Sequence, residues 1–135
     1  MNLRLSVGSN ELFTLPTILI VDDSTVIRRA LRMLFESMAG WEVCGEAANG
    51  REGIEKAQQL KPDVMVLDMS MPEMDGIAVA KALKTKMPGL PIVMFTNFAE
   101  DQFLKHEVLS AGIAQVVSKS DSQGLVRAVK QVFDA

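Results

Sequence analysis

The sequence predicts an α/β fold: a doubly wound, five-stranded parallel sheet of order 2-1-3-4-5 with helices on both faces. Short apolar runs recur along the 135 residues without alternating polar positions, as strands covered on both faces require. Stretches with helical spacing separate these runs, so strands and helices alternate along the chain. With 48% hydrophobic residues the chain can bury one core. We therefore expect a single domain.

Four strong apolar runs and one weaker run define the predicted strands. The strong runs are 18–21, 64–67, 92–95 and 113–117. The weaker run, 42–47, mixes Glu42 and Glu46 with apolar residues, and this composition suits the edge of the sheet.

Apolar residues at helical spacing predict helices between the strands. They are Ile27, Leu31, Leu34 and Met38; Ile54 and Ala57; Ile77, Ala80 and Leu83; and Leu125, Ala128, Val129 and Val132. Residues that can cap a helix N-terminus precede three of these stretches: Ser24 or Thr25, Asp75, and Asp121 or Ser122. The resulting order βαβαβαβαβα favours a flavodoxin-like (βα)5 fold, in which ligands bind outside the carboxyl ends of the first and third strands.

Charge and composition exclude several classes of function. Fourteen Lys and Arg against seventeen Asp and Glu leave a net charge of -3, which gives no general attraction to nucleic acid or anionic lipid. The single cysteine, Cys44, excludes a disulfide framework, and no apolar run has the length of a membrane span. We interpret residues 1–16 as a polar leader before a domain at 17–135, because they lack a hydrophobic signal segment. The expected location is the cytoplasm.

Acidic residues follow two strands that the predicted order makes neighbours. Asp22 and Asp23 end the first strand, and Asp68 ends the third. Three carboxylates in one crevice repel one another, so either their pKa values rise or a divalent cation neutralises them. A site built from carboxylate oxygens suits Mg²⁺.

The last two strands add a hydroxyl and an ammonium group to this crevice. Thr96 ends the fourth strand and Lys119 the fifth. Carboxylates, a metal, a hydroxyl and a lysine match phosphoryl transfer, which depends on charge neutralisation around the phosphoryl oxygens. The sequence holds no Gly-rich phosphate loop of the type G-x-x-x-x-G-K-[ST]. The phosphoryl group therefore has to arrive on a carrier other than a bound nucleotide.

These residues resemble the receiver domains of bacterial two-component response regulators, and the resemblance covers Thr17 to Phe133. It rests on Val21-Asp22-Asp23-Ser24, on Leu67-Asp68-Met69-Ser70-Met71-Pro72-Glu73-Met74-Asp75-Gly76, on Thr96 and on Lys119. The stretch 40–47 and the Asn49-Gly50 turn look most like receivers that precede helix-turn-helix DNA-binding domains. Such an output domain is not within the 135 residues, so we expect either a stand-alone receiver or a piece of a longer regulator.

The resemblance implies a role for each acidic residue. Asp68 would be the phosphoacceptor and would form an aspartyl phosphate. Asp23 and Asp68 would bind Mg²⁺ directly, with the backbone carbonyl of Ser70 as a third ligand, and Asp22 would act mainly through metal-bound water.

The resemblance also implies how the signal passes on. Thr96 and Lys119 would hold phosphoryl oxygens and report to the face formed by the fourth helix, fifth strand and fifth helix, which is also a possible homodimer surface. The phosphoryl donor would be a sensor histidine kinase or a phosphotransfer protein. The domain would catalyse its own phosphorylation and dephosphorylation without being a turnover enzyme.

The sequence departs from the family pattern around the predicted switch. Ser120 replaces the proline that follows the lysine, Val116 replaces an aromatic residue, and Asn97 stands where a very small residue is preferred. Because valine is stiff about χ1, we expect the response to travel through a shift of the loop 97–100 and of the helix after it, with Phe98 as the mobile hydrophobic residue.

Other interpretations remain open at this point. Asp22, Asp23 and Asp68 could each cap a helix, although three at once with the Met-Pro-x-Met-Asp-Gly segment makes this improbable. A degenerate receiver that binds partners without phosphorylation is one alternative. A Mg²⁺-dependent phosphohydrolase is another, but position 70 is Ser rather than the second Asp of such enzymes. We assign no chemistry to Cys44 or to His106, which has no second histidine to share a metal.

Overall fold

The computed structural model describes residues 4–5, 12–13 and 15–135. Five parallel strands form the central sheet in the order β4-β3-β5-β6-β7. They are β3 (Thr17–Val21), β4 (Glu42–Ala47), β5 (Val64–Leu67), β6 (Ile92–Thr96) and β7 (Gln115–Ser118). This is the predicted order 2-1-3-4-5, with the mixed strand β4 at the edge.

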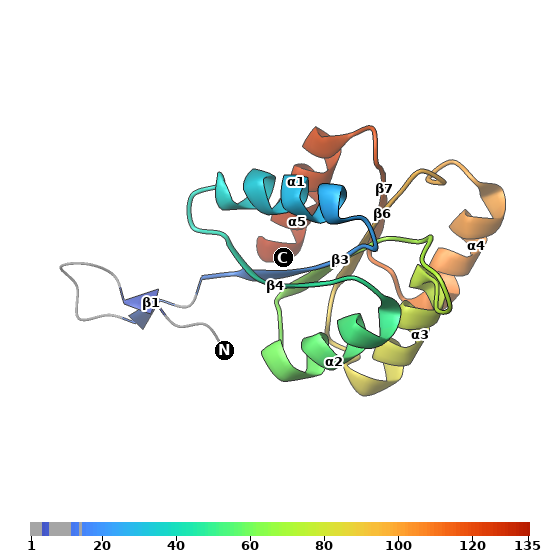
Figure 1. The fold of residues 1–135 in the computed structure, drawn as a ribbon, viewed down its shortest axis with the longest axis horizontal. Helices are drawn as coiled ribbons and strands as arrows, with labels where there is room; N and C mark the ends of the chain where they lie inside the picture. Colours follow the sequence, from blue (N-terminus) through green and yellow to red (C-terminus); the bar gives the residue numbers. More distant parts are fainter. Residues whose placement is uncertain (1–3, 6–11, 14) are drawn as a thin grey trace.

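Five helices cover the two faces of the sheet. They are α1 (Thr25–Glu36), α2 (Gly50–Leu60), α3 (Gly76–Lys86), α4 (Gln102–Ala111) and α5 (Ser122–Phe133). Figure 1 shows α1 and α5 on one side of the sheet and α2, α3 and α4 on the other. Both faces are therefore covered, which explains why the strands do not alternate between apolar and polar residues.

Alternate residues of each strand contribute to two separate apolar cores. In β3, Ile18 and Ile20 pack with Phe35 of α1 and Leu125 of α5. The intervening residues of the strand, with those of β5 and β6, join the core under α2, α3 and α4. The site-bearing strands β3, β5 and β6 are buried along their whole length, so their carboxyl ends are held in fixed positions.

The N-caps confirm three of the predicted helix starts and reveal two more. Ser24, Asp75 and Asp121 accept backbone N–H bonds at the starts of α1, α3 and α5. Asn49 and Asp101 do the same for α2 and α4. The Asn49-Gly50 pair, interpreted as a turn from the sequence, is therefore a helix start.

The N-terminal segment 1–16 lies largely outside the described residues. Within it, β1 (Arg4–Leu5) pairs in antiparallel fashion with β2 (Leu12–Phe13), a pairing that the sequence analysis did not predict. Among the helices of the described ranges, none has both the length and the apolar character that crossing a membrane requires.

Candidate functional site

The predicted site residues lie at the carboxyl ends of four adjacent strands. Val21 and Leu67 are paired across β3 and β5, and the N–H of Asp68 donates to the Val21 carbonyl at 2.9 Å. Asp22 and Asp68 therefore leave the sheet at the same level. The N–H of Lys119 donates to the Thr96 carbonyl at 3.0 Å, which ties the last two strand ends together beside them.

The three aspartates form one cluster. One carboxylate oxygen from each of Asp22, Asp23 and Asp68 lies within 4.8 Å of the other two. Asp22 and Asp68 are 2% and 4% exposed, whereas Asp23 is exposed at the rim. Helix capping does not explain this cluster, because the caps of α1 and α3 are Ser24 and Asp75.

Lys119 joins the two buried carboxylates. Its Nζ lies 3.0 Å from Asp22 Oδ2 and 3.1 Å from Asp68 Oδ1. Burial raises the pKa of Asp68, and repulsion from Asp22 raises it further, in spite of the hydrogen bond from Lys119. Burial acts to lower the pKa of Lys119, but the hydrogen bonds to Asp22 and Asp68 outweigh it and raise that pKa. The cluster thus holds more negative charge than one ammonium balances.

The composition of the cluster fits a magnesium ion. Oxygen ligands from carboxylates are what Mg²⁺ prefers, and it takes one or two of them while keeping several waters. Asp23 offers an exposed carboxylate at the rim, and Asp68 offers a buried one whose ionised form is disfavoured by its surroundings. A cation at this position would relieve both the burial cost and the repulsion.

The loop from Asp68 to Gly76 is held against the end of β5. The N–H of Gly76 donates to the Met69 carbonyl at 2.8 Å. A Cβ at position 76 would overlap the Asp68 carbonyl oxygen and lie 2.9 Å from Met69 Cα. Only glycine permits this close approach. Within the loop, the N–H of Ser70 reaches Asp68 Oδ1 at 3.4 Å, and no contact assigns a role to the Ser70 carbonyl.

Thr96 connects the site to the loop that follows β6. Its side chain is buried and its hydroxyl oxygen accepts a hydrogen bond from the N–H of Phe98 at 3.0 Å. The hydroxyl hydrogen remains available to a further acceptor. The loop 97–100, which was expected to move, is held by a second hydrogen bond, because the N–H of Asp101 donates to the Phe98 carbonyl at 2.9 Å. Phe98 itself is 52% exposed.

Two of the positions that depart from the family pattern, Val116 and Ser120, lie on β7 and just after it, and the third, Asn97, directly follows β6. No peptide bond is cis in the part of the chain that the structure describes, the Lys119–Ser120 bond included. The hydroxyl groups of Ser118 and Ser120 lie 2.8 Å apart and share a hydrogen bond. Val116 is half-buried and lines a groove of about 480 Å³ between α4, β7 and α5.

The residues to which no chemistry was assigned lie away from the cluster. The Sγ of Cys44 lies 3.5 Å from the Ile18 carbonyl, and burial raises the pKa of this thiol, which disfavours the reactive thiolate. His106 is exposed on α4. The Trp41 ring contacts those of Phe35 and Phe133 at centroid distances of 6.2 and 5.2 Å, so it packs across the ends of α1 and α5.

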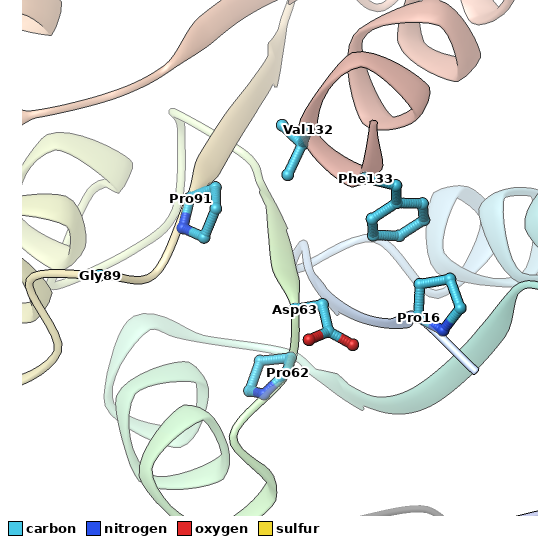
Figure 2. A pocket seen from close by; sticks show the side chains of 7 residues that line it. All are labelled: Pro16, Pro62, Asp63, Gly89, Pro91, Val132 and Phe133. Carbon is cyan, nitrogen blue, oxygen red and sulfur yellow. The ribbon is translucent and has the colours of Figure 1, made fainter. Parts of the chain in front are cut away.

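A cavity of about 540 Å³ lies at the amino ends of β3, β5 and β6, at the end of the sheet opposite the acidic cluster. Figure 2 shows the Asp63 carboxylate there, near Pro16 and Pro62, with Phe133 across the cavity. Asp63 Oδ2 accepts hydrogen bonds from the N–H and the hydroxyl of Thr17 at 2.8 and 3.2 Å. This carboxylate therefore fastens the start of β3, and nothing groups it with the acidic cluster.

Two residues that the sequence did not single out support the site from outside: Arg28 contacts Asp22, and Glu46 contacts Arg28. Arg28 of α1 donates to the Asp22 carbonyl at 2.7 Å and to the Glu46 carboxylate at 3.1 Å. Arg28 stands one turn after the N-cap of α1 and Glu46 stands in the edge strand, so only their tertiary contact relates them.

Comparisons with known proteins agree with this geometry. A family model described as the response regulator receiver domain matches residues 18–130. The chain is 40% identical, over 84% of its length, to a protein-glutamate methylesterase/protein-glutamine glutaminase of Alkalilimnicola ehrlichii, of which it covers 30%. It is 34% identical, over 78% of its length, to the response regulator protein VraR of Staphylococcus aureus, of which it covers 50%. The chain thus spans 30% to 50% of the length of these curated relatives.

Solved structures include isolated domains of the same size. The response regulator domain of Thermotoga maritima CheB superposes with a TM-score of 0.83 at 26% identity, covering 90% of this chain and 98% of that one. The chemotaxis protein CheY4 of Vibrio cholerae gives a TM-score of 0.80 at 31% identity, with 88% and 99% covered.

Proposed function

Because the chain belongs to the response regulator receiver domain family, we propose that it accepts a phosphoryl group on Asp68 from a phosphohistidine donor. The observation that carries the assignment is the cluster itself. Asp68 is the one buried carboxylate that follows the central strand β5, and it stands between two acidic neighbours and the ammonium of Lys119. The donor would be a sensor histidine kinase or a phosphotransfer protein.

In the proposed reaction a carboxylate oxygen of Asp68 attacks phosphorus. A P–O bond forms, the P–N bond of the phosphohistidine breaks, and its electron pair returns to the imidazole nitrogen. The raised pKa of Asp68 reflects a carboxylate that its surroundings stabilise poorly. The acyl phosphate brings further negative charge beside Asp22, so Lys119 and a metal ion would have to balance it. An ionised carboxylate carries no proton on the attacking oxygen, so the proposed reaction needs no separate general base.

The other side chains balance charge. Lys119 lies within 3.1 Å of Asp68 Oδ1 and would move to a phosphoryl oxygen as that oxygen arrives. The Thr96 hydroxyl can donate to a second phosphoryl oxygen while it still accepts from Phe98. Asp23 and Asp68, with the carbonyl of Ser70, would hold Mg²⁺, which supplies neutralisation of the equatorial phosphoryl oxygens. Asp22 would contribute through water.

The output surface is proposed to be the face of α4, β7 and α5. The groove there carries Lys105 and Arg127 together with Glu100 and Asp121. A surface with both signs of charge can match a second copy of itself, which supports a homodimer as one form of output. Sedimentation velocity with and without a phosphoryl mimic tests this, and a monomer under both conditions would exclude it.

Phosphorylation can be tested by intact mass measurement after incubation with a small phosphodonor, with and without Mg²⁺. The proposal predicts a gain of one phosphoryl group that requires Mg²⁺ and is lost in Asp68→Asn. Asp63→Asn is the matched control, because it makes the same chemical change to an exposed carboxylate at the opposite end of β5. No mass gain would favour a phosphorylation-independent binding module, and turnover of many phosphate esters would favour a phosphohydrolase.

A further inference from the structure

Arg28 connects the acidic cluster to the edge of the sheet. Its side chain is 15% exposed and uses its three nitrogens on three different acceptors. Nη1 donates to the Asp22 carbonyl at 2.7 Å, Nε to Glu46 Oε1 at 3.1 Å, and Nη2 to Thr25 Oγ1 at 3.3 Å. A planar guanidinium that is bonded in several directions has little freedom to move.

Glu46 is itself held in place. Its second carboxylate oxygen accepts from Arg32 Nε at 2.6 Å, and Lys56 donates to its backbone carbonyl. The hydrogen bond from Arg32 lowers the pKa of Glu46, and the hydrogen bond from Arg28 adds to this. Glu46 is therefore a fixed, ionised acceptor against which Arg28 is oriented.

The Asp22 carbonyl belongs to the peptide group that leads into Asp23. Every other polar group of Asp22 is also bonded: its N–H donates to the Ala47 carbonyl, and its two carboxylate oxygens accept from the Ser24 N–H and from Lys119. In contrast, the Asp23 carboxylate is exposed and has no hydrogen bond or ion pair within the described part of the chain. The direction of the Asp23 side chain thus depends on the main chain that carries it.

We infer that Arg28 is a positioning residue for the metal site: clamped by Glu46, it fixes the Asp22–Asp23 peptide and so aims the Asp23 carboxylate at Asp68. The inference rests on the proposed function, because it takes Asp23 and Asp68 as the Mg²⁺ ligands. A bond of 2.7 Å from a charged donor to a carbonyl is among the stronger hydrogen bonds. Lysine has a single ammonium on a flexible stem and cannot bridge the carbonyl and Glu46 in the same geometry.

Loss of the Arg28 charge and loss of its positioning role predict opposite changes in Mg²⁺ affinity. Arg28→Met removes a positive charge that contacts the Asp22 carbonyl at the acidic cluster, so charge alone would tighten binding of a cation. Loss of positioning would weaken it. Arg29→Met is the matched control, because Arg29 is the exposed next residue of α1 and its loss changes the net charge by the same amount. Arg28→Lys keeps the charge and removes the bridging geometry.

The experiment measures Mg²⁺ affinity by calorimetry, and the carbonyl and amide resonances of the Asp22–Asp23 peptide in metal-free protein by NMR. We expect Arg28→Met and Arg28→Lys to bind Mg²⁺ about tenfold more weakly, as is typical when a residue that orients metal ligands is lost, and to shift those two resonances before metal is added. Arg29→Met is expected to bind at least as tightly as wild type without the shifts. Glu46→Gln is expected to shift the same resonances, because it releases Arg28.

Two results separate failure of this inference from failure of the proposed function. Unchanged or tighter Mg²⁺ binding in Arg28→Met, with unshifted Asp22–Asp23 resonances, would overturn the positioning role. If wild type itself bound no Mg²⁺, the proposed metal site would be wrong. The role of Arg28 would still be testable, because unshifted Asp22–Asp23 resonances in folded, metal-free Arg28→Lys would show that Arg28 does not fix this peptide.

Discussion

Gly76 allows the loop that carries the proposed phosphoacceptor to close, and Gly76→Ala tests how tightly that loop is built. A Cβ at this position would overlap the Asp68 carbonyl oxygen and lie 2.9 Å from both Met69 Cα and Met94 Cε. Contacts under 3.0 Å are essentially never made by real Cβ atoms. Two of these three neighbours are backbone atoms, so rotating a side chain cannot relieve the overlap. Either the loop 69–75 opens or the start of α3 moves away.

The expected cost follows from what must be disrupted. Forcing an extra methyl into a packed site costs about 1–3 kcal/mol, and stretching the Gly76 N–H bond to Met69 adds up to about 1 kcal/mol. Alanine regains up to about 1 kcal/mol over glycine in a helix, and less at the first residue of α3. We therefore expect Gly76→Ala to lower the free energy of unfolding by about 1–3 kcal/mol and to weaken Mg²⁺ binding.

Urea unfolding and a Mg²⁺ titration measure the two effects on one protein. Gly89→Ala is the control, because a Cβ there meets nothing within 4 Å, and we expect it to leave stability unchanged or raise it by about 0.5 kcal/mol. If Gly76→Ala were as stable as Gly89→Ala and bound Mg²⁺ like wild type, the close approach would not be a requirement of the site.

Three further predictions concern single groups of the site. The pKa of Asp68 is raised, by burial first and by Asp22 second. The folded protein therefore disfavours the carboxylate and loses stability as the pH rises. In urea unfolding, metal-free Asp68→Asn should have a higher free energy of unfolding than wild type at pH 7, and the two proteins should be equal at about pH 3. The pKa of Glu46 is lowered, chiefly by its hydrogen bond from Arg32, so its contribution to stability is present above the ordinary pKa of a glutamate and is lost as the pH falls through the lowered pKa. Glu46→Gln should therefore cost about 0.5–1.5 kcal/mol at pH 7 and progressively less as the pH falls below that of an ordinary glutamate. A cost independent of pH would assign the effect to packing. Thr96→Val removes the acceptor of the Phe98 N–H, so hydrogen exchange of that amide should become about fivefold faster. A phosphoryl mimic should also shift the Phe98 amide resonance far less than in wild type. Equal shifts in both proteins would show that Thr96 does not couple the site to the loop 97–100.

Most of the sheet could be predicted because its three inner strands, β3, β5 and β6, are buried on both faces. A strand such as β5, with four consecutive buried apolar residues, has a pattern that few other structures produce. The helix α4 was predicted only from the alternating order, although its buried residues Leu104, Val108 and Ala111 do stand at helical spacing. Phe103 and Leu109 are 72% and 81% exposed, and these apolar residues on the solvent side obscure the period that its buried residues would show.

The site was predictable where it depends on chain order and less so where it depends on tertiary contacts. Strand ends alone bring Asp22, Asp68 and Lys119 together, as the cluster shows. The clamp of Arg28 on Glu46 forms because β4 lies beside β3 under α1, and neither residue has a local pattern that predicts the other. The hydrogen bond from Phe98 to Thr96 likewise arises from the turn after β6, whose shape no spacing rule specifies.

The central claim is that Asp68 carries the phosphoryl group, and the chemistry of an acyl phosphate allows this to be measured directly. Borohydride reduces an aspartyl phosphate to homoserine, which peptide mass spectrometry can locate at a single position. After incubation with a phosphodonor and Mg²⁺, the account predicts homoserine at position 68 and none at Asp22 or Asp23. Homoserine at either of those two residues, or a phosphoryl group that survives on a serine or on His106, would contradict it.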